Sequence, residues 1–182
     1  MKLTAAITLL LIAGTAHASS NAYIGADVAF LNETDLNIME IKVTHANNMS
    51  FNLVGGYAFE IADSFQVGLE AEYRNFGEAT FLNVLEVKGS AFFINAKPIY
   101  NITDNIYVAA TLGLGQMDLE LKDTETGLTE SETNTAFQLG LESGYQFNNS
   151  ISLNFGYRSA NANIDDIEVR VRGVYAGARY NF

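Results

Sequence analysis

Alternation of apolar and polar residues with a period of two is the feature of this sequence that most limits its possible folds. Between residues 65 and 76, for example, Val67 and Leu69 alternate with Gly68 and Glu70. This period places successive side chains on opposite faces of a β-strand. Eight segments show it, at residues 22–31, 50–61, 65–76, 88–100, 106–118, 134–147, 151–160 and 169–182. The chain is therefore expected to be all-β.

The residues on the polar face distinguish a membrane barrel from a soluble sandwich. A sandwich exposes that face to water and usually covers it with Lys, Glu and Thr. Here the face consists of Gly, Gln, Asn, Ser and a few charges of opposite sign, as expected of a narrow enclosed lumen. Each segment also reaches the roughly 9–11 residues that a tilted transmembrane strand needs. The sequence predicts an eight-stranded antiparallel up-and-down transmembrane β-barrel.

The connections between these segments are short and long in turn. Residues 62–64, 101–105 and 148–150 predict tight turns, whereas 32–49, 77–87, 119–133 and 161–168 predict loops. Such asymmetry is typical of outer-membrane barrels, which have short periplasmic turns and longer extracellular loops. Aromatic residues near strand ends suggest interfacial girdles; they are Tyr23, Tyr57, Phe59, Phe65, Tyr100, Tyr145, Phe147, Tyr180 and Phe182.

The N-terminus has the pattern of a secretory signal peptide. Lys2 provides a positive charge, an apolar run extends from Leu3 to Ile12, and Ala16-His17-Ala18 has the small residues of a cleavage site. We expect residues 1–18 to be removed after Ala18 and residues 19–182 to form the barrel. The protein is thus expected to be exported from the cytoplasm.

Composition excludes several function classes. The 182-residue chain has 10 Lys and Arg against 21 Asp and Glu, a formal charge of −11, so nucleic acid is not an expected partner. It has no Cys and therefore no disulfide or thiolate metal site. Its acidic loops lack the Asp-x-Asp-x-Asp-Gly spacing of a calcium site. We expect no metal and no cofactor.

The C-terminus resembles the assembly signal of outer-membrane barrels. Phe182 is a terminal aromatic residue, Tyr180 precedes it by two positions, and Gly177 lies three further back. With the signal peptide, these residues make the chain similar to the small eight-stranded family that includes the transmembrane domain of outer-membrane protein A and the OmpX- and opacity-type proteins. The resemblance implies a monomer in the outer membrane of a Gram-negative bacterium. It also implies assembly by the barrel-insertion machinery, with periplasmic chaperones.

Four charged residues on the polar face are candidates for an ion-pair network. Glu70, Lys97, Glu142 and Arg158 are similar to the acid–base network that plugs the barrel of outer-membrane protein A, on its third, fourth, sixth and seventh strands. Opposite charges in so narrow a lumen are expected to pair, because an unpaired buried charge is costly. One interpretation is an electrostatic plug. The other is a narrow channel that opens when the pairs exchange partners.

Residues near the outer ends of the strands suggest contacts outside the cell. Lys88, Arg170 and Arg172 are candidates for binding lipopolysaccharide phosphates, directly or beside divalent cations. The segments 32–49 and 77–87 contain apolar residues, which either pack together above the membrane or present a patch to an extracellular protein.

The residue inventory argues against an enzyme. His45 is the only histidine after the signal peptide, and the run His45-Ala46-Asn47 lacks the His-x-Ser pair of lipid A deacylase barrels. No catalytic residue is predicted. The leading expectation is a porin-like but non-catalytic barrel that supports envelope integrity. The alternatives are an adhesin or host-factor binder acting through segments 32–49 and 77–87, and a low-conductance channel.

Overall fold

The structure is a computed structural model that describes residues 21–38, 41–81, 85–123, 128–164 and 167–182. The predicted signal peptide, residues 1–18, lies outside them. The described strands are β1 (Ala22–Ile38), β2 (Ile41–Ala46), β3 (Ser50–Ala62), β4 (Phe65–Phe81), β5 (Leu85–Asn101), β6 (Ile106–Asp123), β7 (Thr129–Gln146), β8 (Ile151–Ile164) and β9 (Ile167–Asn181). No helix in these ranges is long and apolar enough to cross a membrane.

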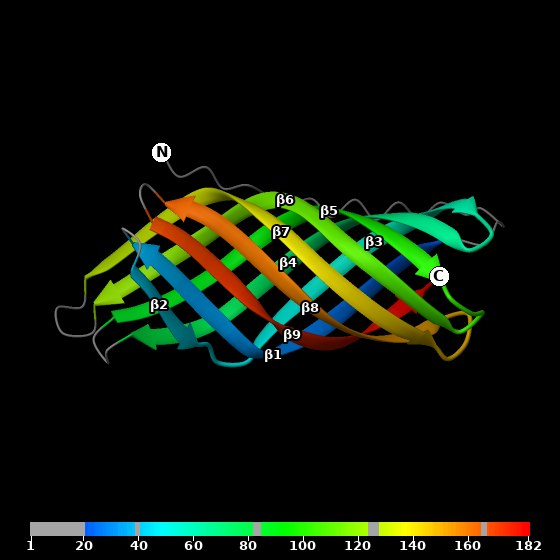
Figure 1. Cartoon of the computed structure of the whole chain (residues 1–182), viewed down its shortest axis with the longest axis horizontal. Helices are drawn as coiled ribbons and strands as arrows, with labels where there is room; N and C mark the ends of the chain where they lie inside the picture. The colour runs from blue at the N-terminus through cyan, green and yellow to red at the C-terminus, as the bar shows by residue number, and fades with distance from the viewer. Residues whose placement is uncertain (1–20, 39–40, 82–84, 124–127, 165–166) are drawn as a thin grey trace.

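The strands form a closed antiparallel barrel, as predicted. Their order is β2-β1-β3-β4-β5-β6-β7-β8-β9, and pairing of β1 with β9 closes the sheet. β1 pairs with β3 along its first half and with β2 along its second half, so β2 and β3 together occupy one position in the wall. The barrel therefore has eight positions in its wall. Its strands are tilted along the long axis, and the C-terminus lies at the end opposite β2 (Figure 1).

The strands extend well beyond the predicted loop boundaries, so the four predicted long loops were wrong in extent. β1 and β2 occupy most of 32–49, β4 and β5 most of 77–87, β6 and β7 most of 119–133, and β8 and β9 most of 161–168. β6 and β7 each have 18 residues, far more than a membrane span requires. In the β4–β5 and β8–β9 hairpins, inward residues above the membrane are apolar and pack in one cluster; they include Ala79, Val87, Ala162 and Val169. The predicted tight turns are confirmed in place.

The outer face carries an apolar band with a sharp limit at the end where β2 lies. Its exposed members include Ile24, Val28, Leu53, Leu69, Ile94, Leu112, Leu139, Leu141, Leu153 and Phe155. Beyond Leu114 on β6 and Phe137 on β7, the outward residues are Gln116 and Thr135. We take this change as the outer boundary of the bilayer. The predicted girdle residues other than Tyr23 point outward or lie at the strand ends, whereas Tyr23 is buried inside the barrel.

Above this boundary the barrel wall divides into two four-stranded sheets. β2, β1, β9 and β8 form one sheet, and β4, β5, β6 and β7 form the other. The β7–β8 ladder ends at Ala136 and Ala162, and the described residues of β2 and β4 form no ladder. We call this two-sheet part of the barrel the head.

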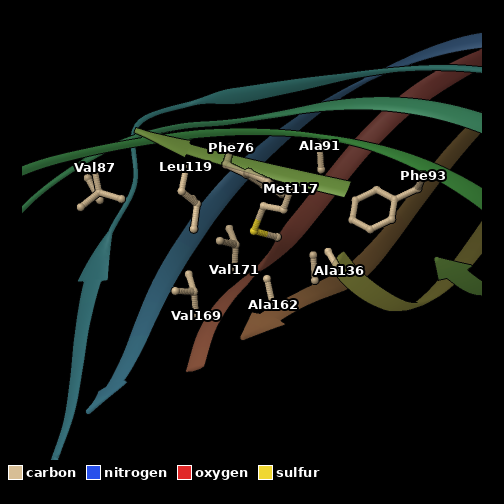
Figure 2. Close-up of a cluster of buried hydrophobic side chains, with 12 residues drawn as sticks. Phe76, Val87, Ala91, Phe93, Met117, Leu119, Ala136, Ala162, Val169 and Val171 are labelled. Carbon is tan, nitrogen blue, oxygen red and sulfur yellow. The ribbon is translucent and has the colours of Figure 1, made fainter. Parts of the chain in front are cut away.

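An apolar cluster fills the space between the two sheets of the head. Figure 2 shows Val169, Val171 and Ala162 of one sheet facing Leu119, Phe76 and other residues of the second. The cluster consists of Phe76, Ala79, Val87, Ala91, Phe93, Met117, Leu119, Ala136, Ala160, Ala162, Val169 and Val171, with Leu36, Leu121 and Ile167 packed against it. Leu36 and Val87 pack here as expected for segments 32–49 and 77–87, whereas Val43 is 43% exposed; Met39, Leu82 and Val84 lie outside the described residues.

A bulge on β4 joins the two sheets at their base. Gly77 has a φ of 73°, in the left-handed region that favours glycine, and the register of β4 and β5 shifts at this point. The amide of Asn48 donates to the carbonyl of Glu78 (2.9 Å), and Asn47 Nδ2 donates to the carbonyl of Phe76 (3.0 Å). The segment between β2 and β3 is thereby bound to β4.

Candidate functional site

The barrel interior contains a network of ion pairs around Lys97. Lys97 Nζ lies 3.1 Å from Glu70 Oε1 and 2.8 Å from Glu142 Oε1, and all three side chains are buried. They lie on β4, β5 and β7, where the alternation points them inward. The structure therefore brings together three of the four residues of the predicted network.

The fourth predicted residue, Arg158, lies in an adjoining set of pairs. Its guanidinium binds Glu72 and lies 3.0 Å from Asp27 Oδ2. Arg179 binds the same Asp27 (2.5 Å) and also Glu142 (3.3 Å), so it links the two sets. The partners of Arg158 are thus Asp27 and Glu72, which the predicted four-residue network did not include.

The lumen charges balance among the described residues. Asp27, Glu70, Glu72 and Glu142 face Arg74, Lys97, Arg158 and Arg179, and each of the eight is at most 4% exposed. Buried ion pairs repay their desolvation only when the remaining donors and acceptors are satisfied. Glu72 meets this condition, because Asn95 (2.8 Å) and Gln138 (2.5 Å) donate to it in addition to Arg158.

Three inward tyrosines complete the network. The hydroxyl of Tyr23 donates to Glu70 (2.9 Å), and those of Tyr107 and Tyr175 donate to Glu142 (3.1 and 2.8 Å). Each ring occupies the space over an inward glycine of the neighbouring strand; these are Gly56, Gly144 and Gly156, respectively. The sequence analysis missed these roles, although the alternation indicates them. Tyr23 is an even number of residues from Asp27 on β1, and Tyr175 is an even number from Arg179 on β9, so each tyrosine points into the lumen with the charged residue.

The lumen is filled at two successive levels. A cavity of about 300 Å³ opens at the end that holds both described termini, and Lys97 and Arg179 line it. Farther from that end, the charged network fills the lumen first, and the apolar cluster of the head fills it next. Arg74 stands at the junction, with its guanidinium 4.9 Å from the centre of the Phe76 ring. The two levels close the lumen by different chemistry.

The three predicted lipopolysaccharide contacts lie on the outer face above the membrane boundary, each beside a carboxylate. Lys88 Nζ lies 3.2 Å from Glu78, Arg170 lies 2.8 Å from Glu168, and Arg172 binds Glu33 (3.0 Å) and Asp35 (3.5 Å). The hydrogen bond to Glu78 raises the pKa of Lys88, and the charge of Asp35 raises the pKa of Arg172. Both shifts favour the charged forms of Lys88 and Arg172. Arg170 and Arg172 lie two positions apart on the outward face of β9, whereas Lys88 lies on β5 in the other sheet of the head.

The residues of the C-terminal signature also have structural contacts. The rings of Tyr180 and Phe182 meet edge to face with centroids 5.2 Å apart on the outer surface. Gly177 faces inward, and a Cβ there would lie 2.5 Å from the carbonyl oxygen of Ala26. A side chain at Gly177 would therefore crowd the wall next to Asp27.

The structure also shows where His45 and the acidic residues Asp118 and Glu120 lie. His45 lies on β2 with an exposed side chain, not in a loop as predicted. In the described part of the chain, no three His, Asp or Glu side chains are placed to hold a metal ion. Asp118 and Glu120 are on the exposed outer face of β6, where Thr133 donates to Asp118 (2.5 Å).

Comparison with known proteins agrees with this architecture. The model of the outer membrane protein beta-barrel domain matches residues 3–182. Neisserial surface protein A is similar in structure, with a TM-score of 0.66 and 14% identity over 90% of this chain and 98% of the other. The attachment invasion locus protein Ail of Yersinia pestis has a TM-score of 0.58 and 17% identity over 89% and 99%.

The same fold also occurs in an enzyme. The outer membrane protease OmpT from Escherichia coli has a TM-score of 0.50 and 9% identity, over 88% of this chain and 97% of the other. At such identities the likeness concerns the fold alone. No curated protein matches this sequence significantly.

Proposed function

The chain belongs to the outer membrane protein β-barrel family, and on this premise we propose that it is a non-catalytic, closed barrel that supports the integrity of the bacterial outer membrane. The observation that carries the proposal is the lumen filled at two levels, first by balanced charges and then by apolar side chains. Neither a solute path nor an accessible catalytic group is needed for this role. The rigid wall and its apolar band are the functional parts.

A deletion strain tests the proposal through its sensitivity to EDTA and detergent. One complementing gene encodes the whole protein. A second shortens the head by joining Asp118 to Thr133, which face each other in the β6–β7 ladder, through a two-residue turn. Heat-dependent migration in gels checks that both barrels fold. We expect both to restore resistance, and a deletion strain with no envelope defect would refute the proposal.

A second candidate function is adhesion through the head. The observation that favours it is the position of β2, whose described ladder pairs all lie with β1. An extended segment of another protein can add to such a strand edge. Val43, 43% exposed on β2, offers an apolar contact beside this edge.

Binding of the bacteria to host cells tests this candidate. Val43→Lys places a charge beside the β2 edge, and Ser131→Lys places the same charge on exposed β7 in the other sheet as a control. Adhesion predicts loss of binding for Val43→Lys alone. Equal binding by the wild type, both variants and the deletion strain would exclude it.

A further inference from the structure

A groove of about 590 Å³ opens on the outer face of the barrel where β7 and β8 part. The ladder between them ends at Ala136 and Ala162. β7 nevertheless continues to Thr129 while paired with β6, and β8 continues to Ile164 while paired with β9. The β6–β7 and β8–β9 ladders therefore support the two strands that line the groove. Its volume lies within the roughly 300–1,000 Å³ typical of small-molecule sites.

The groove lies at the outer boundary of the bilayer. Leu114 and Phe137, which are 64% and 41% exposed, line the groove on its membrane side. They are the last apolar outward residues of β6 and β7 before the head. The next outward residues, Gln116 and Thr135, are polar. One part of the groove therefore faces hydrocarbon, and the other faces head groups and water.

The two sides of the groove differ in polarity along a single row of cross-strand neighbours. Leu114 pairs with Phe137, Phe137 with Asn161, and Asn161 with Arg170. Strands lie about 4.8 Å apart, so the row passes from an aliphatic residue to a guanidinium within roughly 15 Å. An amphipathic molecule matches this row better than a uniformly polar or apolar one.

Arg170 is oriented by its neighbours and still accessible. Its Nε donates to Asn161 (2.7 Å) and one terminal nitrogen donates to Glu168 (2.8 Å). These bonds engage two of the five donors of a guanidinium, and the side chain is 43% exposed. A guanidinium held in this way can bind a phosphate through its other donors.

The parted strands also determine which polar groups the ligand must offer. Beyond Ala136 and Ala162, the facing edges of β7 and β8 form no ladder with each other, so their amides and carbonyls need other partners. Near the bilayer such partners are head groups as well as water. A glycolipid whose sugars carry hydroxyl and amide groups offers donors and acceptors, whereas a phosphodiester head group offers mainly acceptors.

We propose that the groove between β7 and β8 binds a phosphorylated glycolipid of the outer leaflet, with an acyl chain against Leu114 and Phe137 and a phosphate at Arg170. Glu168 competes with the phosphate for the guanidinium and weakens the complex. This site goes beyond the proposed function, because a barrel can stabilise a membrane without a specific lipid site.

Native mass spectrometry of the protein extracted from outer membranes in mild detergent tests the proposal. We expect wild-type protein to retain one phosphorylated glycolipid. Arg170→Gln and Phe137→Ala should each reduce the retained fraction by about tenfold, the effect of losing one strong contact. Glu168→Gln should increase it. The controls, Lys122→Gln and Phe92→Ala, change an exposed cation and an exposed aromatic residue outside the groove lining and should behave as wild type.

Competition identifies the ligand. Delipidated protein is offered the phosphorylated glycolipid, the same glycolipid after phosphatase treatment, or phosphatidylglycerol, and only the first should bind tightly. Equal retention by all variants, equal binding of phosphatidylglycerol, or no retained lipid would overturn the proposal. Should either loss variant fail to fold by gel migration, Thr135→Trp replaces it, because an indole there fills the groove and should exclude the lipid.

Discussion

Lys97 and Glu142 are joined by an ion pair of 2.8 Å in the barrel interior, although 45 positions separate them in the chain. The same ammonium group lies 3.1 Å from Glu70, so one lysine pairs with carboxylates on two strands. β6 lies between β5 and β7 in the wall, and the pair therefore crosses the lumen side of that strand rather than joining neighbours. Lys97 on β5 is therefore linked to both β4 and β7.

Replacement of Lys97 by methionine is expected to destabilise the barrel by about 3–5 kcal/mol, because two buried carboxylates lose their shared cation. The midpoint of urea unfolding from lipid vesicles measures the effect. Lys88→Met is the control, since its pair with Glu78 is solvent-exposed and should leave the midpoint unchanged. Similar midpoints for both variants would show that the lumen pair is not stabilising.

The two-level closure predicts how conductance responds to mutation. Wild-type protein and Arg158→Ala should both give no steady current in planar bilayers, because the apolar cluster closes the lumen above the charged network. Current is expected only when Arg158→Ala is combined with Phe76→Ala and Met117→Ala. A channel gated by the ion pairs predicts the opposite, namely that Arg158→Ala alone conducts.

Tyr175 contributes through both its hydroxyl and its ring. Tyr175→Phe removes the hydrogen bond to Glu142 and should cost about 1–3 kcal/mol. Tyr175→Leu also removes the ring that lies 3.8 Å from the Arg158 guanidinium, and should cost roughly 0.5–2 kcal/mol more. Thermal unfolding in detergent measures both. Tyr73→Phe, on the outer face, should match wild type.

Gly77 is expected to be sensitive to the addition of a single methyl group. Gly77→Ala places a side chain at a φ of 73°, at a cost of about 1–2 kcal/mol, and its Cβ would lie 2.7 Å from the carbonyl oxygen of Asn48. Hydrogen exchange should therefore become faster in β2 and the outer part of β4.

Gly55→Ala provides the control for this substitution. Nothing lies within 4 Å of a Cβ at Gly55, so the variant should exchange like wild type. Unchanged exchange in Gly77→Ala would show that the bulge does not hold the two sheets of the head together.

The inward position of the four predicted charges followed from the alternation of the strands, whereas their selection as a network rested on the resemblance to outer-membrane protein A. Glu70, Lys97, Glu142 and Arg158 have the parity of the polar face, and all four are buried in the lumen. Which lumen charges form ion pairs with each other could not be predicted from the alternation, because the pairing depends on the relative register of the strands and on closure of the barrel. Arg158 thus binds Asp27, 131 residues away, through a contact that no local pattern contains.

The extent of the strands was underestimated for a related reason. Acidic side chains such as Glu120 indicate solvent, and the sequence analysis assigned residues 119–133 to a loop. The inward neighbours Leu119 and Leu121 nevertheless pack between the sheets of the head, which is enough to continue the ladder. Polar outward residues therefore do not end a strand while its other face still has a partner.

The sequence by itself determined the alternating faces, the eight wall positions and the burial of balanced charges, because a period of two is a property of the backbone and acts locally. Only the tertiary structure decided which charges pair, where the apolar cluster closes the lumen, and where β7 and β8 part. These features depend on how strands distant in the chain are aligned when the barrel closes. Alignment is a collective result of packing, and no single segment encodes it.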